Sequence, residues 1–170
     1  MKTSLLKSAC VALCTAGALA ACSPKFDWRD FRSTEAPYAV MFPAKPATQT
    51  RPVKLGEQEV KLSMAAAEVD GAMFAVGTAE LPDAGQAALA VQALKTAMVQ
   101  NIHGQVTKEG TQNGAFVVEA RGSLPNGKQM LMHGRFLSKD KRVYEVIIVG
   151  PEKQFNQDTV DTFMSSFKLY

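Results

Sequence analysis

The sequence predicts an α+β domain in which two helices pack on an antiparallel sheet of about six strands. Three features of the 170-residue chain carry this prediction: short segments that alternate apolar and polar residues, turn residues between them, and two segments with helical spacing. Short connections favour antiparallel pairing, because parallel strands need long crossovers. There are no internal repeats or low-complexity tracts, so we expect a single domain.

The first 22 residues have the pattern of a secretory signal. Lys2 and Lys7 give a basic start, and the uncharged apolar run at 8–18 is too short to span a bilayer. The run ends in the sequence LAAC at 19–22, which resembles the lipobox of bacterial lipoproteins. A soluble exported protein, with a cysteine at this position by chance, is the alternative.

The lipobox resemblance implies cleavage between Ala21 and Cys22 and attachment of diacylglycerol to the Cys22 thiol, with acylation of the new amine. The predicted organisation is a signal peptide at 1–21, a lipidated tether at 22–36 and one globular domain at 37–170. Two or more acyl chains give stable membrane attachment. Ser23, which is not an aspartate, resembles the signal for outer-membrane sorting, so we expect the periplasmic face of the outer membrane.

Cleavage changes the cysteine count and the net charge of the mature chain. Cys10 and Cys14 leave with the signal, so the mature chain has no disulfide, no cysteine nucleophile and no cysteine-ligated metal. Removing the first 21 of 170 residues leaves 149, with 17 of the 19 basic residues against 16 acidic ones. This near-neutral balance argues against a nucleic-acid partner.

The tether contains Phe26, Trp28 and Phe31 among charges of mixed sign. These aromatic residues fit either a membrane interface or packing on the domain edge, and the mixed charges favour packing. Strand segments then follow, with Gly56-Glu57 and Asp70-Gly71 as turns. We expect these strands at 38–42, 51–55, 59–66 and 73–80.

The central helix is predicted at 84–102. Its apolar residues recur at offsets of three and four, Asp83 is a suitable N-cap, and Gly104 is a C-terminal stop. Three strands follow at 114–121, 128–137 and 143–149, with Asn126-Gly127 as a two-residue hairpin turn. A second amphipathic helix contains Val160, Phe163, Met164 and Phe167, capped by Asn156 or Asp158.

Two short motifs resemble PsbP/Mog1-like domains, as also found in small lipoproteins of Gram-negative bacteria. The first is the strand and proline motif YAVMFPAKP at 38–46, and the second is the ending SFKL at 166–169. The resemblance covers roughly residues 36–170 and implies an α/β sandwich with a central helix, an antiparallel meander and a C-terminal helix. Its members include assembly or accessory factors without shared catalytic residues, so it assigns no site residues.

No catalytic or cofactor motif is recognisable. His103 and His133 lack a neighbouring nucleophile and orienting acid, and there is no phosphate loop, zinc motif or calcium loop. Met130, Met132 and His133 have the chemistry of a copper site. On a strand, however, both methionines would lie on one face and the histidine on the other. We therefore predict no metal, no cofactor and no enzymatic activity.

Two functions remain open. The first is a non-catalytic accessory or binding lipoprotein that contacts another envelope protein from the membrane surface. The alternative is a periplasmic carrier that holds a lipid or other apolar ligand between the central helix and the sheet. Such a pocket would be lined by Phe74, Leu94, Met98 and Phe116.

Overall fold

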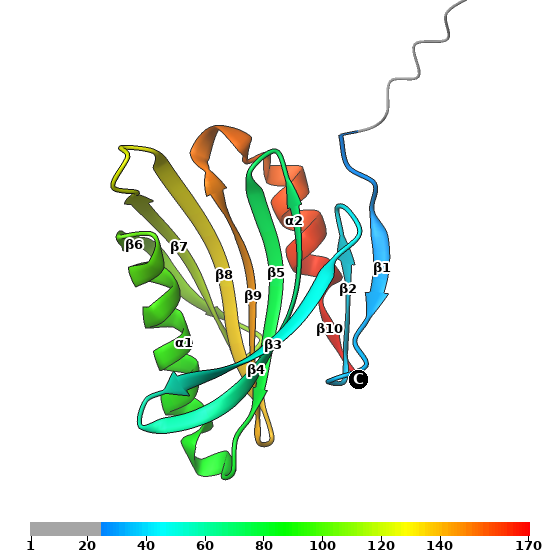
Figure 1. The fold of residues 1–170 in the computed structure, drawn as a ribbon, viewed down its shortest axis with the longest axis vertical. Helices are drawn as coiled ribbons and strands as arrows, with labels where there is room; N and C mark the ends of the chain where they lie inside the picture. Colours follow the sequence, from blue (N-terminus) through cyan, green and yellow to red (C-terminus); the bar gives the residue numbers. More distant parts are fainter. Residues whose placement is uncertain (1–24) are drawn as a thin grey trace, which may run out of the picture.

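The computed structural model describes residues 25–170, which form two β-sheets and two α-helices (Figure 1). The small sheet contains β1 (Arg29–Arg32), β2 (Tyr38–Phe42) and β10 (Lys168–Leu169). The strands of the large sheet are β3 (Ala47–Leu55), β4 (Gln58–Val69), β5 (Ala72–Glu80), β6 (Gly104–Gln112), β7 (Ala115–Ser123), β8 (Gln129–Lys139) and β9 (Arg142–Pro151). The helices are α1 (Ala87–Asn101) and α2 (Gln157–Ser166), with short 3₁₀ turns at Ala84–Gln86 and Glu152–Gln154.

The large sheet has the strand order β3-β4-β5-β9-β8-β7-β6, and each neighbouring pair is antiparallel. Hairpins join β3 to β4 and β4 to β5, and α1 then crosses to β6, from which a meander returns to β9 beside β5. The outer strands β3 and β6 each have an irregular feature. Pro52 lies within β3, and a register shift interrupts β6 between Val106 and Lys108. The α+β class is therefore confirmed.

The two faces of the large sheet have separate cores. On one face, α1 packs over β8 and β9, and this cluster includes Leu94, Phe136 and Ile147. On the other face, α2 and the small sheet pack over the same central strands. The second cluster is rich in aromatic residues: the ring centroids of Phe42 and Phe163 are 5.6 Å apart. Because both faces are covered, β9 is buried along most of its length.

Most predicted elements lie where expected, but the sheet is larger than predicted. The structure adds β1, β6 and β10 to the strands expected from the sequence. The segment expected to be a tether, 22–36, contains β1, which pairs with β2, so the folded domain begins before residue 37. Trp28 packs on the domain edge, with its ring 6.5 Å from that of Phe74. The signal residues 1–21 lie outside the described part of the chain.

Two turn predictions are corrected. Asn126-Gly127 does not form a two-residue hairpin: the connection runs from Leu124 to Lys128, and the backbone N–H of Leu124 donates to the Lys128 carbonyl over 3.0 Å. Of this pair, Gly127 alone has a positive φ, of 79°, whereas the type I′ hairpin turn that Asn-Gly favours needs a positive φ at both residues. At the end of α1, the left-handed position with φ of 50° is His103, one residue before the expected Gly104.

The caps agree with the expected chemistry. The Asp83 carboxylate accepts from the Gly85 N–H at 2.9 Å, which begins the 3₁₀ turn that leads into α1. Asn156 caps α2 by accepting from the Asp158 N–H at 2.8 Å. Asp70-Gly71 forms the predicted hairpin turn, with φ of 52° and 77° at the two residues. No helix in residues 25–170 is long and apolar enough to cross a membrane.

A carboxyl group lies inside the core beneath α1. Glu145 on β9 is 0% exposed, and neither carboxyl oxygen has a hydrogen-bond partner among the described residues. Its cross-strand neighbour is Gly77, where a Cβ atom would lie 2.5 Å from Glu145 Oε1, so glycine makes room for the carboxyl. Burial raises the pKa of Glu145 from 4.5 to about 7, and the charge of Arg51 opposes this shift.

We predict that Glu145→Gln removes a pH-dependent loss of stability. A carboxyl whose pKa is higher in the folded state stabilises the fold below its unfolded pKa, and this contribution is lost as the pH rises from 4.5 to about 7. Relative to the wild type, the variant should therefore gain roughly 3 kcal/mol of unfolding free energy between pH 4 and pH 8. Urea denaturation at both pH values measures this difference. The exposed Glu57→Gln is the control, and an equal pH profile for wild type and Glu145→Gln would contradict the assignment.

Candidate binding groove between α2 and the sheet

The structure separates the four residues predicted to line one pocket. Leu94, Met98 and Phe116 belong to the cluster beneath α1. Phe74 lies on the opposite face, where its ring is 5.4 Å from that of Phe163 on α2. The reason is strand alternation: on β5, even-numbered residues from 74 to 78 face α2 and odd-numbered ones face α1. The expectation of one shared pocket is therefore corrected. Ala21 and Cys22 lie outside the described residues.

A groove runs along the other helix, between α2 and strands β6 to β8. Its volume is about 470 Å³, and a neighbouring hollow of about 540 Å³ shares part of its lining. The residues common to both are Gln112, Val117, Asp161 and Met164. Val117 is 38% exposed, so an apolar side chain is available at the centre of the groove. Concave sites that combine apolar surface with a few polar groups are typical of binding sites.

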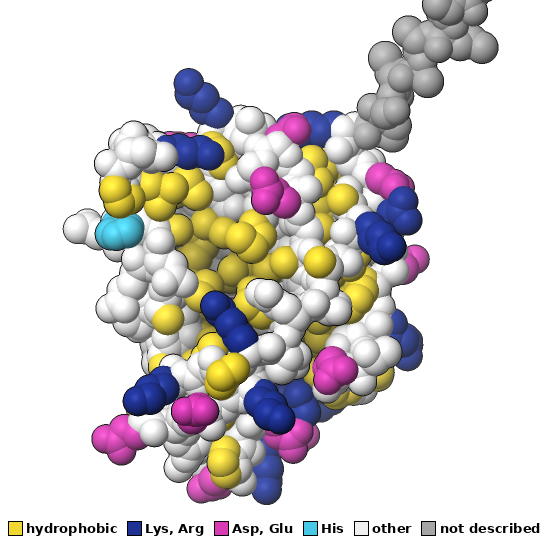
Figure 2. All heavy atoms as spheres, in the orientation of Figure 1, with side chains coloured by type: hydrophobic (Ala, Val, Ile, Leu, Met, Phe, Trp, Pro, Cys, Tyr) yellow, Lys and Arg dark blue, Asp and Glu magenta, His cyan; other side chains and the backbone are white. Residues whose placement is uncertain are grey.

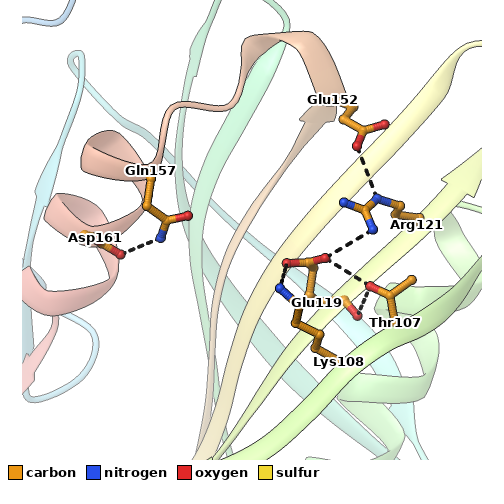
Figure 3. A network of polar contacts seen from close by, with 7 residues as sticks. All are labelled: Thr107, Lys108, Glu119, Arg121, Glu152, Gln157 and Asp161. Atoms are coloured by element: carbon orange, nitrogen blue, oxygen red, sulfur yellow. Dashed lines mark hydrogen bonds and ion pairs between the residues drawn. The ribbon is translucent and has the colours of Figure 1, made fainter.

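The sheet wall of the groove carries a network of charges centred on Glu119 (Figure 3). The Glu119 side chain is 13% exposed and lies 3.6 Å from Lys108 Nζ and 3.5 Å from Arg121 Nη1. The Thr107 hydroxyl donates to Glu119 Oε1 at 3.1 Å. Arg121 also contacts Glu152 at 3.2 Å, which ties the meander to the turn before α2. Glu119 therefore lies between two cationic side chains and accepts one hydrogen bond from Thr107.

The helix wall presents a carboxylate of its own. Gln157 Nε2 donates to Asp161 Oδ1 at 2.8 Å along one turn of α2, and Figure 3 shows both side chains across the groove from the Glu119 network. Further along, Arg135 lies with its guanidinium carbon 5.9 Å from the Phe167 ring centroid. The buried Nε of Arg135 has no partner among the described residues. The helix wall thus contributes an acidic group, and the sheet wall contributes both acidic and basic groups, on either side of exposed apolar surface.

His133 lies on the sheet wall, with its ring close to Phe155 in the segment that precedes α2. It lies opposite Glu119 in the β7–β8 register, and its ring centroid is 5.5 Å from that of Phe155. Burial lowers the pKa of His133 below its usual value of 6.5, and the carboxylate of Glu119 opposes that shift. The imidazole is therefore neutral at pH 7 and can both donate and accept a hydrogen bond.

Side chains alternate between the two faces of the sheet along β8. Met132 packs beneath α1, while His133 lies on the α2 face, so the alternation predicted for this strand is confirmed. Within residues 25–170, no three His, Cys, Asp or Glu side chains are grouped so that they could hold a metal ion. What the groove offers is a set of fixed charges, one neutral imidazole and apolar contact area.

Sequence reasoning did not identify this groove. It considered His133 only as a residue without a neighbouring nucleophile and orienting acid, and it did not single out Glu119, whereas both are partly buried and line the groove. The missed element is β6, since its Lys108 and Glu109 complete the lining. A usable signal was the pair Glu119 and His133, because ionisable residues on adjacent meander strands can face one another.

Comparisons with known proteins support the fold. No protein-family profile matches the sequence, and no curated protein matches it significantly. The fold is similar to the solution structure of cyanobacterial PsbP (CyanoP) from Synechocystis, with a TM-score of 0.51 and 14% identity, over 91% of this chain and 99% of that one. A crystal structure from Bacteroides thetaiotaomicron matches with a TM-score of 0.44 and 13% identity, over 84% of this chain. This chain spans 48% of the Bacteroides chain. The similarity to CyanoP shows that the protein has a PsbP-like fold.

We predict that Glu119→Gln lowers the pKa of His133 further. The Glu119 carboxylate stabilises the imidazolium across the strand pair, so its removal leaves burial and the charges of Lys108 and Arg121 to favour the neutral ring. An NMR titration of the His133 ring proton measures the change. The control is Glu109→Gln, because Glu109 pairs with Lys95 instead. An unchanged or higher His133 pKa in Glu119→Gln would show that the two side chains do not interact in solution.

Proposed function

We propose that this protein is a lipid-anchored, non-catalytic accessory or binding protein of the cell envelope, displayed on the periplasmic face of the outer membrane. The observation that carries the binding role is the groove between α2 and β6 to β8, with charged groups on both walls around the exposed Val117. In this proposal, the groove holds a segment of another envelope protein. No cofactor takes part.

The proposed anchor rests on the sequence. The LAAC motif ends at Cys22, and the first described residue, Lys25, lies only three positions later. A chain attached through Cys22 would hold the domain close to the lipid surface, because each residue of an extended chain spans at most about 3.6 Å. Acylation at both the thiol and the amine would supply the two or more chains that stable attachment needs.

The mixed charge of the groove favours a protein segment as the occupant. Acidic and basic groups can pair with side chains of either sign, and such complementarity selects a partner more than it increases affinity. Val117 and the half-buried Met164 supply apolar contact between the charged walls. A purely apolar ligand would remove water from Asp161, whose partner is the neutral Gln157 amide and not a cation, at a desolvation cost.

A second candidate function is favoured by the opposite face. Figure 2 shows hydrophobic side chains gathered over the sheet beside α1. Met73 is 40% exposed there, and partly buried apolar residues surround the same cluster: Val53, Met64, Ala66, Met98, Val99, Phe116, Met130 and Val149. Methionine is flexible and adapts to apolar ligands of varied shape. This surface supports the alternative of a carrier for a lipid or other apolar molecule.

We predict that the mature protein begins at Cys22 and carries acyl chains. After expression in a Gram-negative host, the intact mass should equal that of residues 22–170 plus diacylglycerol and one fatty acid. The variant Cys22→Ser should lose both the mass shift and the membrane fraction. An unlipidated chain cut elsewhere would remove the anchor from the proposal and leave a periplasmic binding domain.

We predict that a photo-crosslinking residue at Val117 captures one envelope protein in living cells. The same probe at Leu89, which is 75% exposed on α1, is the matched control and should not capture it. Adding Asp161→Lys to the Val117 probe should abolish the crosslink, because it reverses one charge of the groove. A probe at Met73 distinguishes the second candidate. A lipid adduct there, together with no groove-dependent product at Val117, would replace the accessory role with the carrier role.

A further inference from the structure

A row of hydroxyl groups crosses three strands of the large sheet on the face that α2 and the small sheet cover. The register places Thr50 of β3 opposite Ser63 of β4, and Ser63 opposite Thr78 of β5. Residues directly opposite one another project from the same face, so the three side chains are neighbours. Thr50 Oγ1 and Ser63 Oγ lie 2.9 Å apart and share a hydrogen bond.

The innermost hydroxyl of the row is unsatisfied. Thr78 is 1% exposed, and its Oγ1 has no hydrogen-bond partner among the described residues. Native proteins rarely leave a buried hydroxyl without a partner, because nothing then compensates for its removal from water. Thr78 also lines the pocket that the row borders, so its hydroxyl lies at the buried inner end of that pocket.

This row lines a pocket of about 240 Å³. Its other side is formed by Phe31 and Tyr38, together with the connection between β1 and β2. The Ser33 hydroxyl accepts from the backbone N–H groups of Glu35 at 3.1 Å and Ala36 at 3.2 Å, which fixes that connection over the pocket. The pocket is thus built from ordered backbone, and its volume is below the roughly 300–1,000 Å³ of drug-sized sites.

The chemistry of the lining selects a neutral polar ligand. Hydroxyl groups both donate and accept, so they match a ligand whose own groups do the same. Glu35 is the one charged residue among the described residues of the lining, so an anion would meet no positive group there. An apolar ligand would leave the hydroxyls unpaired. The half-buried Phe31 adds an apolar surface that suits the C–H face of a sugar ring.

We propose that the pocket between the hydroxyl row and the β1–β2 connection binds a neutral sugar unit, either free or at the end of a glycan chain. Thr78 would bond the innermost hydroxyl of that unit, and Ser63 and Thr50 would bond the next ones. The pocket shares no lining residue with the groove beside α2. A substitution in the lining of one site therefore leaves the lining residues of the other unchanged.

The test is saturation-transfer NMR on the full-length protein in a detergent without sugar headgroups. The probes are glucose, galactose, N-acetylglucosamine and mannitol, followed by a linear tetrasaccharide of N-acetylglucosamine. We expect saturable binding of at least one probe, weakened about tenfold or more by Thr78→Val, which removes the hydroxyl and keeps the shape. Thr96→Val makes the same change at an exposed position of α1, outside both sites, and should bind as the wild type does.

Two further comparisons complete the test. Thr50→Val alters an exposed position of the row and should weaken binding even if Thr78→Val fails to fold. Binding of a monosaccharide identifies a free sugar as the ligand, whereas binding of the tetrasaccharide alone identifies a glycan end. The proposal is overturned if no probe binds, or if neither hydroxyl substitution weakens binding, since an ordered water would then account for Thr78.

Discussion

The fold depends on covering both faces of one central strand pair. Strands β5 and β9 lie in the middle of the large sheet, and most residues along them are buried. A strand with two apolar faces is stable only when layers pack on both sides. Here α1 covers one face, while α2 and the small sheet share the other. Burial of apolar surface in these two layers is the main favourable contribution to folding.

The two proposed sites exist because α2 and the small sheet together are smaller than the sheet face on which they pack. The ten residues of α2 span roughly 15 Å, whereas the eleven residues of β8 span roughly 35 Å. A helix this short and the small sheet beside it cannot cover the whole face of a seven-stranded sheet. The uncovered area on the β6 to β8 side becomes the groove, and that on the β3 and β4 side becomes the hydroxyl pocket. Both sites therefore lie where strands of the large sheet extend beyond the area covered by α2 and the small sheet.

The sequence predicted the elements whose residues alternate or repeat, and missed those that lack such a pattern. Strands such as β4 and β9 were recognisable because their apolar residues contribute to the core. Eight of the nine residues of β6 are exposed, so the strand carries no apolar periodicity and is held by its pairing with β7. β1 and β10 are too short to show alternation. Strand pairing at long sequence separation determines these elements, and the local sequence pattern does not reveal such pairing.

Site residues were harder to predict than elements, for a geometric reason. The spacing within β5 separates residues that face α1 from those that face α2, but it does not say which helix covers which set. The expected pocket therefore combined Phe74 with Leu94 from opposite faces. The strand register is what identifies Glu119, His133 and Thr78 as site residues, because it places each beside its neighbours on adjacent strands.

The irregular features of the two outer strands have a consequence for crowding. Pro52 removes an N–H donor from the edge formed by β3, and the register shift between Val106 and Lys108 disturbs the edge formed by β6. Unprotected edges allow sheets of neighbouring molecules to join and aggregate. Proteins confined to a surface meet one another far more often than proteins free in volume. Under the proposed lipid anchoring, interrupted edges would let many copies of this domain share one surface without merging into a continuous sheet.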